Sequence, residues 1–150
     1  MTSDTEDATL ERLNLQSSIS ELAHIPEWIE RLAARYAISS DLQFAMDLCL
    51  EEVISNIMRH GYAGQPGRPI RAQFSSPREG HFVLVVEDEA PHFNPLAAPE
   101  LPCVDSQGLA RIGGHGIRLV RHFAGSLEYQ QIPGGNRLSL GFSASEATPR

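Results

Sequence analysis

Two polar side chains stand out in the largely apolar stretch that runs from Leu48 to Tyr62. Glu52 and Asn56 are four residues apart, so on a helix they lie one turn apart on the same face. A carboxylate and an amide in an apolar neighbourhood need partners that offset their desolvation. The Mg²⁺ ion of a nucleotide and a reacting hydroxyl would be such partners, whereas a partly solvated helix face is the plainer alternative.

An acidic residue ends the most apolar run of the sequence, His81–Asp88. Such a run favours a buried strand. A strand that ends on Asp88 brings a carboxylate to the edge of a sheet, where ligands are commonly recognised. An aspartate that caps a turn is the alternative reading.

A glycine cluster, Gly113-Gly-His-Gly116, precedes apolar residues at helical spacing. Glycines that open a helix let backbone N–H groups approach phosphates, and the helix dipole favours the negative charge. No Gly-Lys-Ser or Gly-Lys-Thr follows, so the cluster is not a Walker sequence. By itself it is not specific to a nucleotide site.

A long helix is expected to carry the first pair of residues. The stretch Ser39-Ser-Asp-Leu-Gln43 offers an N-cap for this helix, and Ser40 to Gln43 has the spacing of a capping box. His60 falls in the last turn, and Gly61 is expected to close the helix in the left-handed conformation. An amphipathic helix with apolar positions from about residue 20 to 36 precedes it, and Pro26 is tolerable only near the first turn of its main part.

The remaining elements are expected to be strands. Leucines in alternation predict an edge strand within residues 9–15, and two hairpins follow later in the chain. The first hairpin pairs residues 70–74 with 81–87 through a link at 75–80, and the second pairs 126–132 with 137–142. Residues 91–112 contain four prolines and no clear periodicity, which predicts a long loop of the kind that is usually functional or mobile.

Composition limits the classes of function. The 150 residues suit one domain, and a formal net charge of -7 argues against direct binding of nucleic acid or an anionic membrane. No apolar run is long enough to span a bilayer, and residues 1–7 are acidic where a signal peptide is basic, so we expect a cytoplasmic protein. Cys49 and Cys103 form no zinc or disulfide pattern; we expect a core residue and a loop thiol.

The order of these motifs resembles the GHKL ATPase superfamily, and within it the small anti-sigma-factor serine kinases. Glu52-Val-Ile-Ser-Asn56 matches their N-box, and His60-Gly-Tyr62 its usual continuation. The segments 87–95 and 113–120 resemble the first and second glycine boxes, and 135–140 the final strand. The likeness covers about residues 9–142, which leaves 1–8 as a disordered leader and 143–150 as a polar tail.

The resemblance implies an α+β fold, a two-layer sandwich of the Bergerat, histidine-kinase-like ATPase type. Its sheet would be mixed but mostly antiparallel, with about five strands and three helices on one face. The nucleotide would lie between the helix layer and a lid loop at about 96–112.

The resemblance also implies a role for each matching residue. Glu52 would be the general base, Asn56 would coordinate Mg²⁺, and Asp88 would accept a hydrogen bond from the adenine amino group. The backbone N–H groups of Gly113, Gly114 and Gly116 would bind the ATP phosphates. Arg59 or His60 would add positive charge nearby, and Arg111 is a weaker candidate for the same role.

Two residues of the implied nucleotide site depart from the family pattern. Ala90 stands where the family has glycine, and its methyl group would crowd the adenine or forbid a backbone angle that only glycine takes easily. His115 stands where leucine is common, and its side chain would point either to solvent or to phosphate. Glu51 lies about a hundred degrees round the helix from Glu52 and is expected to be a solvated neighbour.

The resemblance implies an ATP-dependent protein-serine kinase that also acts as an anti-sigma factor. Such proteins, usually homodimers, hold a sigma factor and phosphorylate a STAS-type anti-anti-sigma protein. A binding module with weakened or no turnover is the alternative, because of Ala90. A detached histidine-kinase ATPase domain is disfavoured, since no helix with a phosphoacceptor histidine is seen before the N-box and the chain looks complete.

Overall fold

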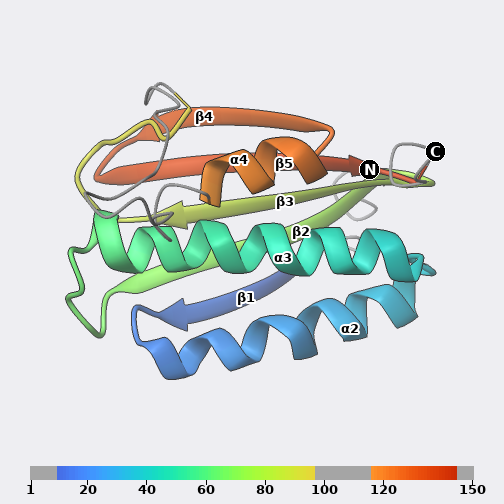
Figure 1. Ribbon diagram of the computed structural model, residues 1–150, viewed down its shortest axis with the longest axis horizontal. Coiled ribbons are helices and arrows are strands. Elements are labelled where there is room, and N and C mark those ends of the chain that lie inside the picture. Colours follow the sequence, from blue (N-terminus) through green and yellow to red (C-terminus); the bar gives the residue numbers. More distant parts are fainter. Residues whose placement is uncertain (1–9, 97–115, 145–150) are drawn as a thin grey trace, which may run out of the picture.

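The protein folds as two layers, a sheet and a set of helices that cover one of its faces (Figure 1). The computed structural model describes residues 10–96 and 116–144. The strands are β1 (Glu11–Gln16), β2 (Pro69–Arg78), β3 (His81–Asp88), β4 (Ser126–Ile132) and β5 (Gly135–Ser143), and the helices are α2 (His24–Tyr36), α3 (Ser40–Asn56) and α4 (Gly116–Phe123).

The sheet has the strand order β1-β2-β3-β5-β4, and every described pairing is antiparallel. The predicted α+β two-layer sandwich with about five strands and three helices is confirmed, but the sheet was expected to be mixed and no parallel pair occurs among its described strands. The expected edge strand is also confirmed, because β1 pairs only with β2 at one side of the sheet.

The helix starts agree with the sequence in part. A 3₁₀ turn at Ile19–Ala23 precedes α2, whose first turn holds Pro26, where a missing N–H costs little. The Ser39 hydroxyl accepts a hydrogen bond from the Leu42 N–H at 3.3 Å, so Ser39 is the N-cap of α3. Ser40 is then already helical, and the capping box predicted from Ser40 is not formed.

Two predicted linkers are shorter than expected. Strand β2 runs to Arg78, with an irregular register between Ser75 and Arg78 that accommodates Pro77. The predicted link at 75–80 therefore shrinks to the two residues between β2 and β3. In the other hairpin β5 begins at Gly135, before the expected start at 137, so the link after β4 is shorter too. Strand β5 ends at Ser143, one residue into the predicted tail.

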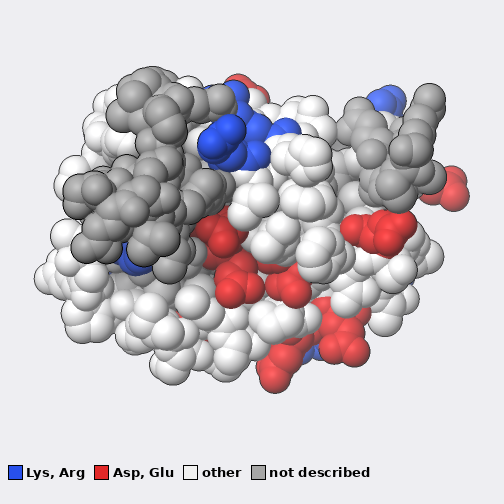
Figure 2. All heavy atoms as spheres, in the orientation of Figure 1, with Lys and Arg blue, Asp and Glu red and all other residues white. Residues whose placement is uncertain are grey.

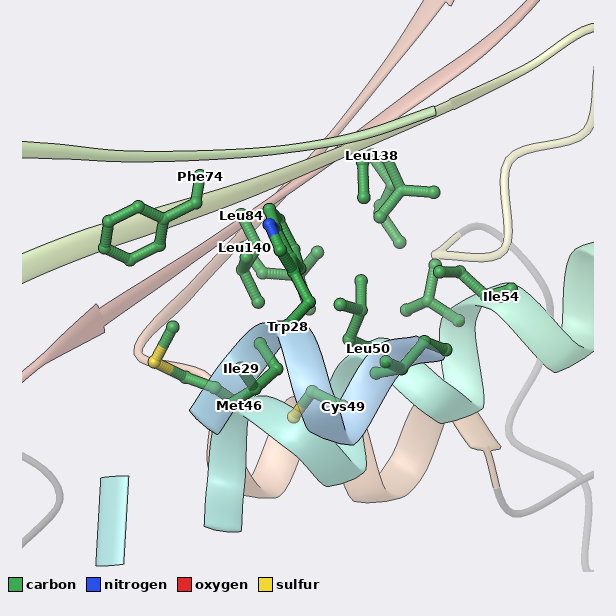
Figure 3. Close-up of a cluster of buried hydrophobic side chains, with 14 of the residues drawn as sticks. Trp28, Ile29, Met46, Cys49, Leu50, Ile54, Phe74, Leu84, Leu138 and Leu140 are labelled. Carbon is green, nitrogen blue, oxygen red and sulfur yellow. The ribbon is translucent and has the colours of Figure 1, made fainter. Parts of the chain in front are cut away.

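The core lies between the two layers. Figure 3 shows Phe74, Leu84 and Leu140 of the sheet pointing toward side chains of α2 and α3. Alternate residues of each strand face the helices, as the two-residue period of a strand requires. Cys49 is fully buried there as expected, and burial raises the pKa of its thiol to about 12. Cys103 lies outside the described residues.

The opposite face of the sheet carries a row of charges. The Arg137 Nε donates to Glu87 at 2.6 Å, and the Arg71 Nε lies 3.5 Å from the same carboxylate. Glu87 precedes Asp88, so the two carboxylates point to opposite faces. These ion pairs join β2, β3 and β5 beside Asp88.

Candidate functional site

The C-terminal end of α3 meets the end of β3, at the left of Figure 1. The hydroxyl of Tyr62, just beyond α3, accepts a hydrogen bond from the Glu89 N–H at 2.7 Å, one residue after β3. A Cβ added to Gly61 would lie 3.2 Å from the Ala90 Cβ. The fold thus brings the segment after Asn56 against the segment after Asp88.

We use two names for the residues around this meeting point. The helix end consists of Glu52, Asn56, Arg59 and His60, and the strand end consists of Asp88, Glu89 and Ala90 together with Asn136 of β5. Helix α4 begins with Gly116 on the same side of the molecule (Figure 1). All of the predicted lid at 96–112 except Leu96, and with it Arg111, lies outside the described residues. Gly113, Gly114 and His115 lie outside them as well.

The backbone of the helix end departs from the predicted helix. The α-helix stops at Asn56 and a π-helical turn, Ile57–Gly61, follows it. Gly61 was expected to be left-handed, and this is wrong: the positive φ angles come later, 53° at Ala63 and 80° at Gly64. Wide turns of this kind are rare and frequently occur at functional sites.

The polar side chains of the helix end are partly open to solvent. Glu52 and Asn56 are half-buried, and Arg59 and His60 are exposed. The Asn56 Oδ1 accepts a hydrogen bond from the Arg59 guanidinium at 3.0 Å. Within residues 10–96 and 116–144, no side chain forms a hydrogen bond or an ion pair with the Glu52 carboxylate. The Glu52 carboxylate therefore has no described partner, whereas the Asn56 Oδ1 is shared with Arg59.

Three residues of the strand end, Asp88, Ala90 and Asn136, are buried, whereas Glu89 is exposed. Asp88 is only 5% exposed. Its Oδ1 accepts hydrogen bonds from the Ala90 N–H at 2.9 Å and the Asn136 Nδ2 at 2.8 Å. Burial raises the pKa of Asp88, while these hydrogen bonds and Arg71 act to lower it. No described residue donates to Oδ2, so one carboxylate oxygen remains for a ligand.

Asn136 fixes the loop that follows β3. Its Nδ2 also reaches the carbonyls of Ala90 and Pro91, each at 3.2 Å. Its Oδ1 accepts from the Phe93 N–H at 3.0 Å and from the Tyr129 hydroxyl. A backbone N–H can only donate, which sets the orientation of the amide. One side chain thus binds the Asp88 carboxylate and four other polar groups near it.

Sequence reasoning gave Asn136 no role, because it reads as the end of a turn. The sequence does contain one indication of its role, which is its position in the alternation of side chains along β5. Asn136, Leu138 and Leu140 alternate on the side of the sheet that faces the helices, and all three are buried. A polar residue at a core position of a strand needs a specific partner, and here that partner is Asp88.

Gly135 lets β5 approach the end of β3 closely. A Cβ at this position would lie 1.8 Å from the backbone oxygen of Asp88, far inside any allowed contact. Only glycine fits here, for reasons of space and not of φ. This close approach is what brings the amide of Asn136 onto the Asp88 carboxylate.

Ala90 fits the site without the strain expected from the sequence. It is only 3% exposed, and its φ is not in the left-handed region. Its methyl group belongs to the core cluster and lies against Gly61, which has no side chain. The predicted backbone conflict is therefore wrong, because this position uses an ordinary backbone angle.

Charge is divided across the helix face of the molecule. Figure 2 shows acidic side chains over α3 and basic ones over α4; the sequence supplies Asp41, Asp47, Glu51 and Glu52 on the first, and Arg118 and Arg121 on the second. Burial, and then the charge of Glu51, raise the pKa of Asp47. Glu51 is exposed, as expected of a solvated neighbour.

None of the helices within residues 10–96 and 116–144 combines the length and the apolar character needed to cross a bilayer.

Comparison with known proteins places these features in a family. Residues 15–142 match the histidine kinase-like ATPase domain. The serine/threonine-protein kinase BtrW of Bordetella bronchiseptica (strain ATCC BAA-588 / NCTC 13252 / RB50) is 35% identical over 114 residues, which cover 75% of this chain and 79% of that protein.

A solved structure agrees in fold. The RsbU and RsbW domains of Rv1364c from Mycobacterium tuberculosis superpose with a TM-score of 0.63 at 13% identity, over 89% of this chain and 31% of that one. The chain thus corresponds to about a third of that protein's length. On the strength of the sequence match over most of its residues, the chain belongs to the histidine kinase-like ATPase domain family and is related within it to a serine/threonine-protein kinase.

Proposed function

We propose that this protein binds Mg²⁺-ATP between the helix end and the strand end and transfers the γ-phosphate to a serine of a STAS-type anti-anti-sigma protein. The observation that carries the proposal is the one-sided hydrogen bonding of Asp88. Its Oδ1 is occupied by two donors, and its Oδ2 is free of described partners, in a residue that is only 5% exposed. An acceptor held in this way suits an adenine amino group and disfavours guanine, which presents a carbonyl there.

The helix end fits a magnesium ion. Mg²⁺ prefers oxygen ligands and keeps several waters and phosphate oxygens, so one protein amide is sufficient. The half-buried Asn56 Oδ1 is such a ligand, and Arg59 would release it and turn toward the phosphates. The bound ion would neutralise charge on the phosphate oxygens. Gly113, Gly114 and Gly116 would add backbone N–H groups, with His60 and His115 nearby.

Glu52 would serve as the general base. Its carboxylate, free of described partners, would accept the proton of the serine hydroxyl as that oxygen forms a bond to the γ-phosphorus. The bond between this phosphorus and the bridging oxygen breaks, and ADP leaves. This role requires hydrogen-bond reach to the hydroxyl, which a residue one turn from Asn56 on the same helix face provides.

The proposed cellular role is partner exchange. The protein would hold a sigma factor in one state and phosphorylate the STAS protein in the other, as a cytoplasmic homodimer without direct contact to nucleic acid. The relationship to BtrW supports the kinase part. The acidic surface over α3 suits a basic partner (Figure 2).

Calorimetry on the wild-type chain with ATP and Mg²⁺ tests the nucleotide site, with Asp88→Asn as the matched control. The variant keeps the shape of the side chain but replaces one carboxylate oxygen by an amide donor. We expect binding in the wild type and its loss in the variant. Equal binding by both proteins would show that Asp88 does not recognise the base.

Transfer of labelled phosphate from ATP to a STAS-domain protein of the same genome tests the catalytic step. We expect Glu52→Ala to bind ATP as the wild type does but to transfer phosphate at least about a hundredfold more slowly. An unchanged rate would remove Glu52 from its role as base. ATP binding without any transfer by the wild type would favour the alternative, a nucleotide-sensing module that sequesters its partner.

A further inference from the structure

Tyr62 makes a connection between two strands that no backbone hydrogen bond supplies. The Glu89 N–H donates to the Tyr62 hydroxyl at 2.7 Å, and this hydroxyl donates to the Pro69 carbonyl at 2.6 Å. The β2–β3 pairing ends where Ile70 lies opposite Asp88, so Pro69 and Glu89 form the next pair along. One phenol oxygen joins this pair; we call the connection the Tyr62 bridge.

The Tyr62 side chain is well placed to hold such a bridge. It is only 5% exposed, and its single hydroxyl both donates and accepts, which satisfies the phenol completely. Burial raises the pKa of Tyr62, so the hydroxyl keeps the proton that it donates to Pro69. The bridge is therefore present throughout the neutral pH range.

The backbone of Tyr62 is anchored in the helix end. Its N–H donates to the Ile57 carbonyl at 2.8 Å, which closes the π-helical turn that follows Asn56. The Gly64 N–H donates to the Met58 carbonyl at 2.8 Å and extends this turn. The main chain of Tyr62 is thus bound to the turn after α3, whereas its hydroxyl is bound to the loop after β3.

The other end of the bridge is Glu89, in the loop that follows β3. Glu89 lies between Asp88 and Ala90, and the Ala90 N–H donates to Asp88 Oδ1. Asn136 holds this loop from β5, whereas Tyr62 holds it from the side of α3. Within the described residues, the Tyr62 bridge is the hydrogen bond that ties the loop to the helix end.

We propose that Tyr62 is a positioning residue for nucleotide recognition, which sets the distance between the Asp88 carboxylate and the Asn56 amide. This inference rests on the proposed function. A nucleotide that is bound at its base by one end and at its phosphates by the other needs the two ends in fixed register, since misplacement by about 1 Å is costly. Without the bridge the loop is still bound to Asn136 and packed against Gly61, but it loses its hydrogen bond to the segment that follows α3.

The test compares Tyr62→Phe with Tyr36→Phe, in the full chain. Each variant loses one hydroxyl and keeps its ring, but the Tyr36 hydroxyl donates to Glu11, on β1, at 3.1 Å. We expect Tyr62→Phe to bind Mg²⁺-ATP about tenfold more weakly and to discriminate less between ATP and GTP, whereas Tyr36→Phe binds as the wild type does. A role in stability alone would leave the ATP to GTP preference unchanged.

Amide hydrogen exchange measured by NMR without nucleotide gives an independent readout. In Tyr62→Phe the Glu89 amide loses its acceptor, so we expect faster exchange at Glu89 and Ala90 and no change there in Tyr36→Phe. Wild-type exchange at Glu89, or wild-type affinity and selectivity in Tyr62→Phe, would overturn the inference. Failure of the wild-type protein to bind ATP would instead refute the proposed function, and exchange at Glu89 would still decide whether the bridge holds this loop.

Discussion

The two ends of the candidate site are built in opposite ways. At the strand end, Asp88 and Asn136 are 5% and 8% exposed and are joined to each other and to the surrounding loop by hydrogen bonds. At the helix end, Asn56 has one described side-chain partner, the exposed Arg59. The strand end is pre-organised by the fold, whereas the helix end presents groups that remain free to bind.

This difference has a physical basis in what each end would bind. A base is recognised by a few directional hydrogen bonds in a buried place, where a misplaced acceptor is costly. Phosphates and Mg²⁺ carry strong charge and bring their own water, so their protein ligands can remain solvated until binding. We therefore expect changes at the strand end to affect folding and binding together, and changes at the helix end to affect binding alone.

The largest effect is expected from Gly135→Ala. The new methyl group would lie 1.8 Å from the Asp88 carbonyl oxygen, so β5 has to move away from β3, at a cost of about 3 kcal/mol or more. Urea unfolding measures this loss. The control is Gly134→Ala, where φ is 77° but nothing lies within 4 Å; backbone strain alone should cost about 1 kcal/mol. Equal losses would mean that the close approach at Gly135 is relaxed in solution.

The next largest effect is expected from Asn136→Ala. This change leaves the Phe93 N–H and the Tyr129 hydroxyl without their acceptor and removes one donor from Asp88. Loss of a buried network of this kind should lower the free energy of unfolding by about 2–4 kcal/mol and weaken ATP binding as well. A variant of wild-type stability would contradict the pre-organised strand end.

A smaller effect concerns the pKa of Asp88, which burial raises above its ordinary value of 3.8. The folded state then binds this proton more tightly than the unfolded chain does. The resulting stability is present below the ordinary pKa and is lost as the pH rises through the pKa of the folded state. Carboxyl ¹³C NMR of the nucleotide-free protein should report this raised pKa, with a further rise in Asn136→Ala, because one donor to the charged form is lost. A lower pKa in the variant would contradict the assigned hydrogen bond.

The smallest effect on stability is expected from Asn56→Ala at the helix end. Its amide is half-buried and bonded to an exposed arginine, so the unfolding midpoint should stay close to that of the wild type. Mg²⁺-dependent ATP binding should nevertheless be lost in calorimetry. A large loss of stability would show that both ends are structural and would remove the contrast between them.

The sequence predicted the helix end better than the strand end. Glu52 and Asn56 are four residues apart on one helix, so their relation follows from helical geometry alone. The prediction of how that helix ends was wrong, because the π-helical turn and the ordinary φ of Gly61 depend on contacts with Ala90 and with the Tyr62 bridge. Turn residues in isolation do not reveal such contacts.

At the strand end the sequence singled out Asp88 but not the residues that hold it. Asn136 is 48 positions away from Asp88, and Tyr62 is 27 positions away from Glu89. Ala90 was expected to crowd the adenine or to need a backbone angle that favours glycine; the second is wrong, and Gly61 leaves space for its methyl group. These relations are long-range, and residue type and local spacing carry no information about them.

The sequence by itself determined the elements, the antiparallel hairpins and the order of the motifs, because apolar periodicity and turn chemistry act over a few residues. Only the tertiary structure decided that one oxygen of Asp88 is occupied and the other is free, and that β5 and the end of α3 meet the same loop. The reason is that hydrogen bonds in a buried site depend on positions in space that strand register and helix packing set together.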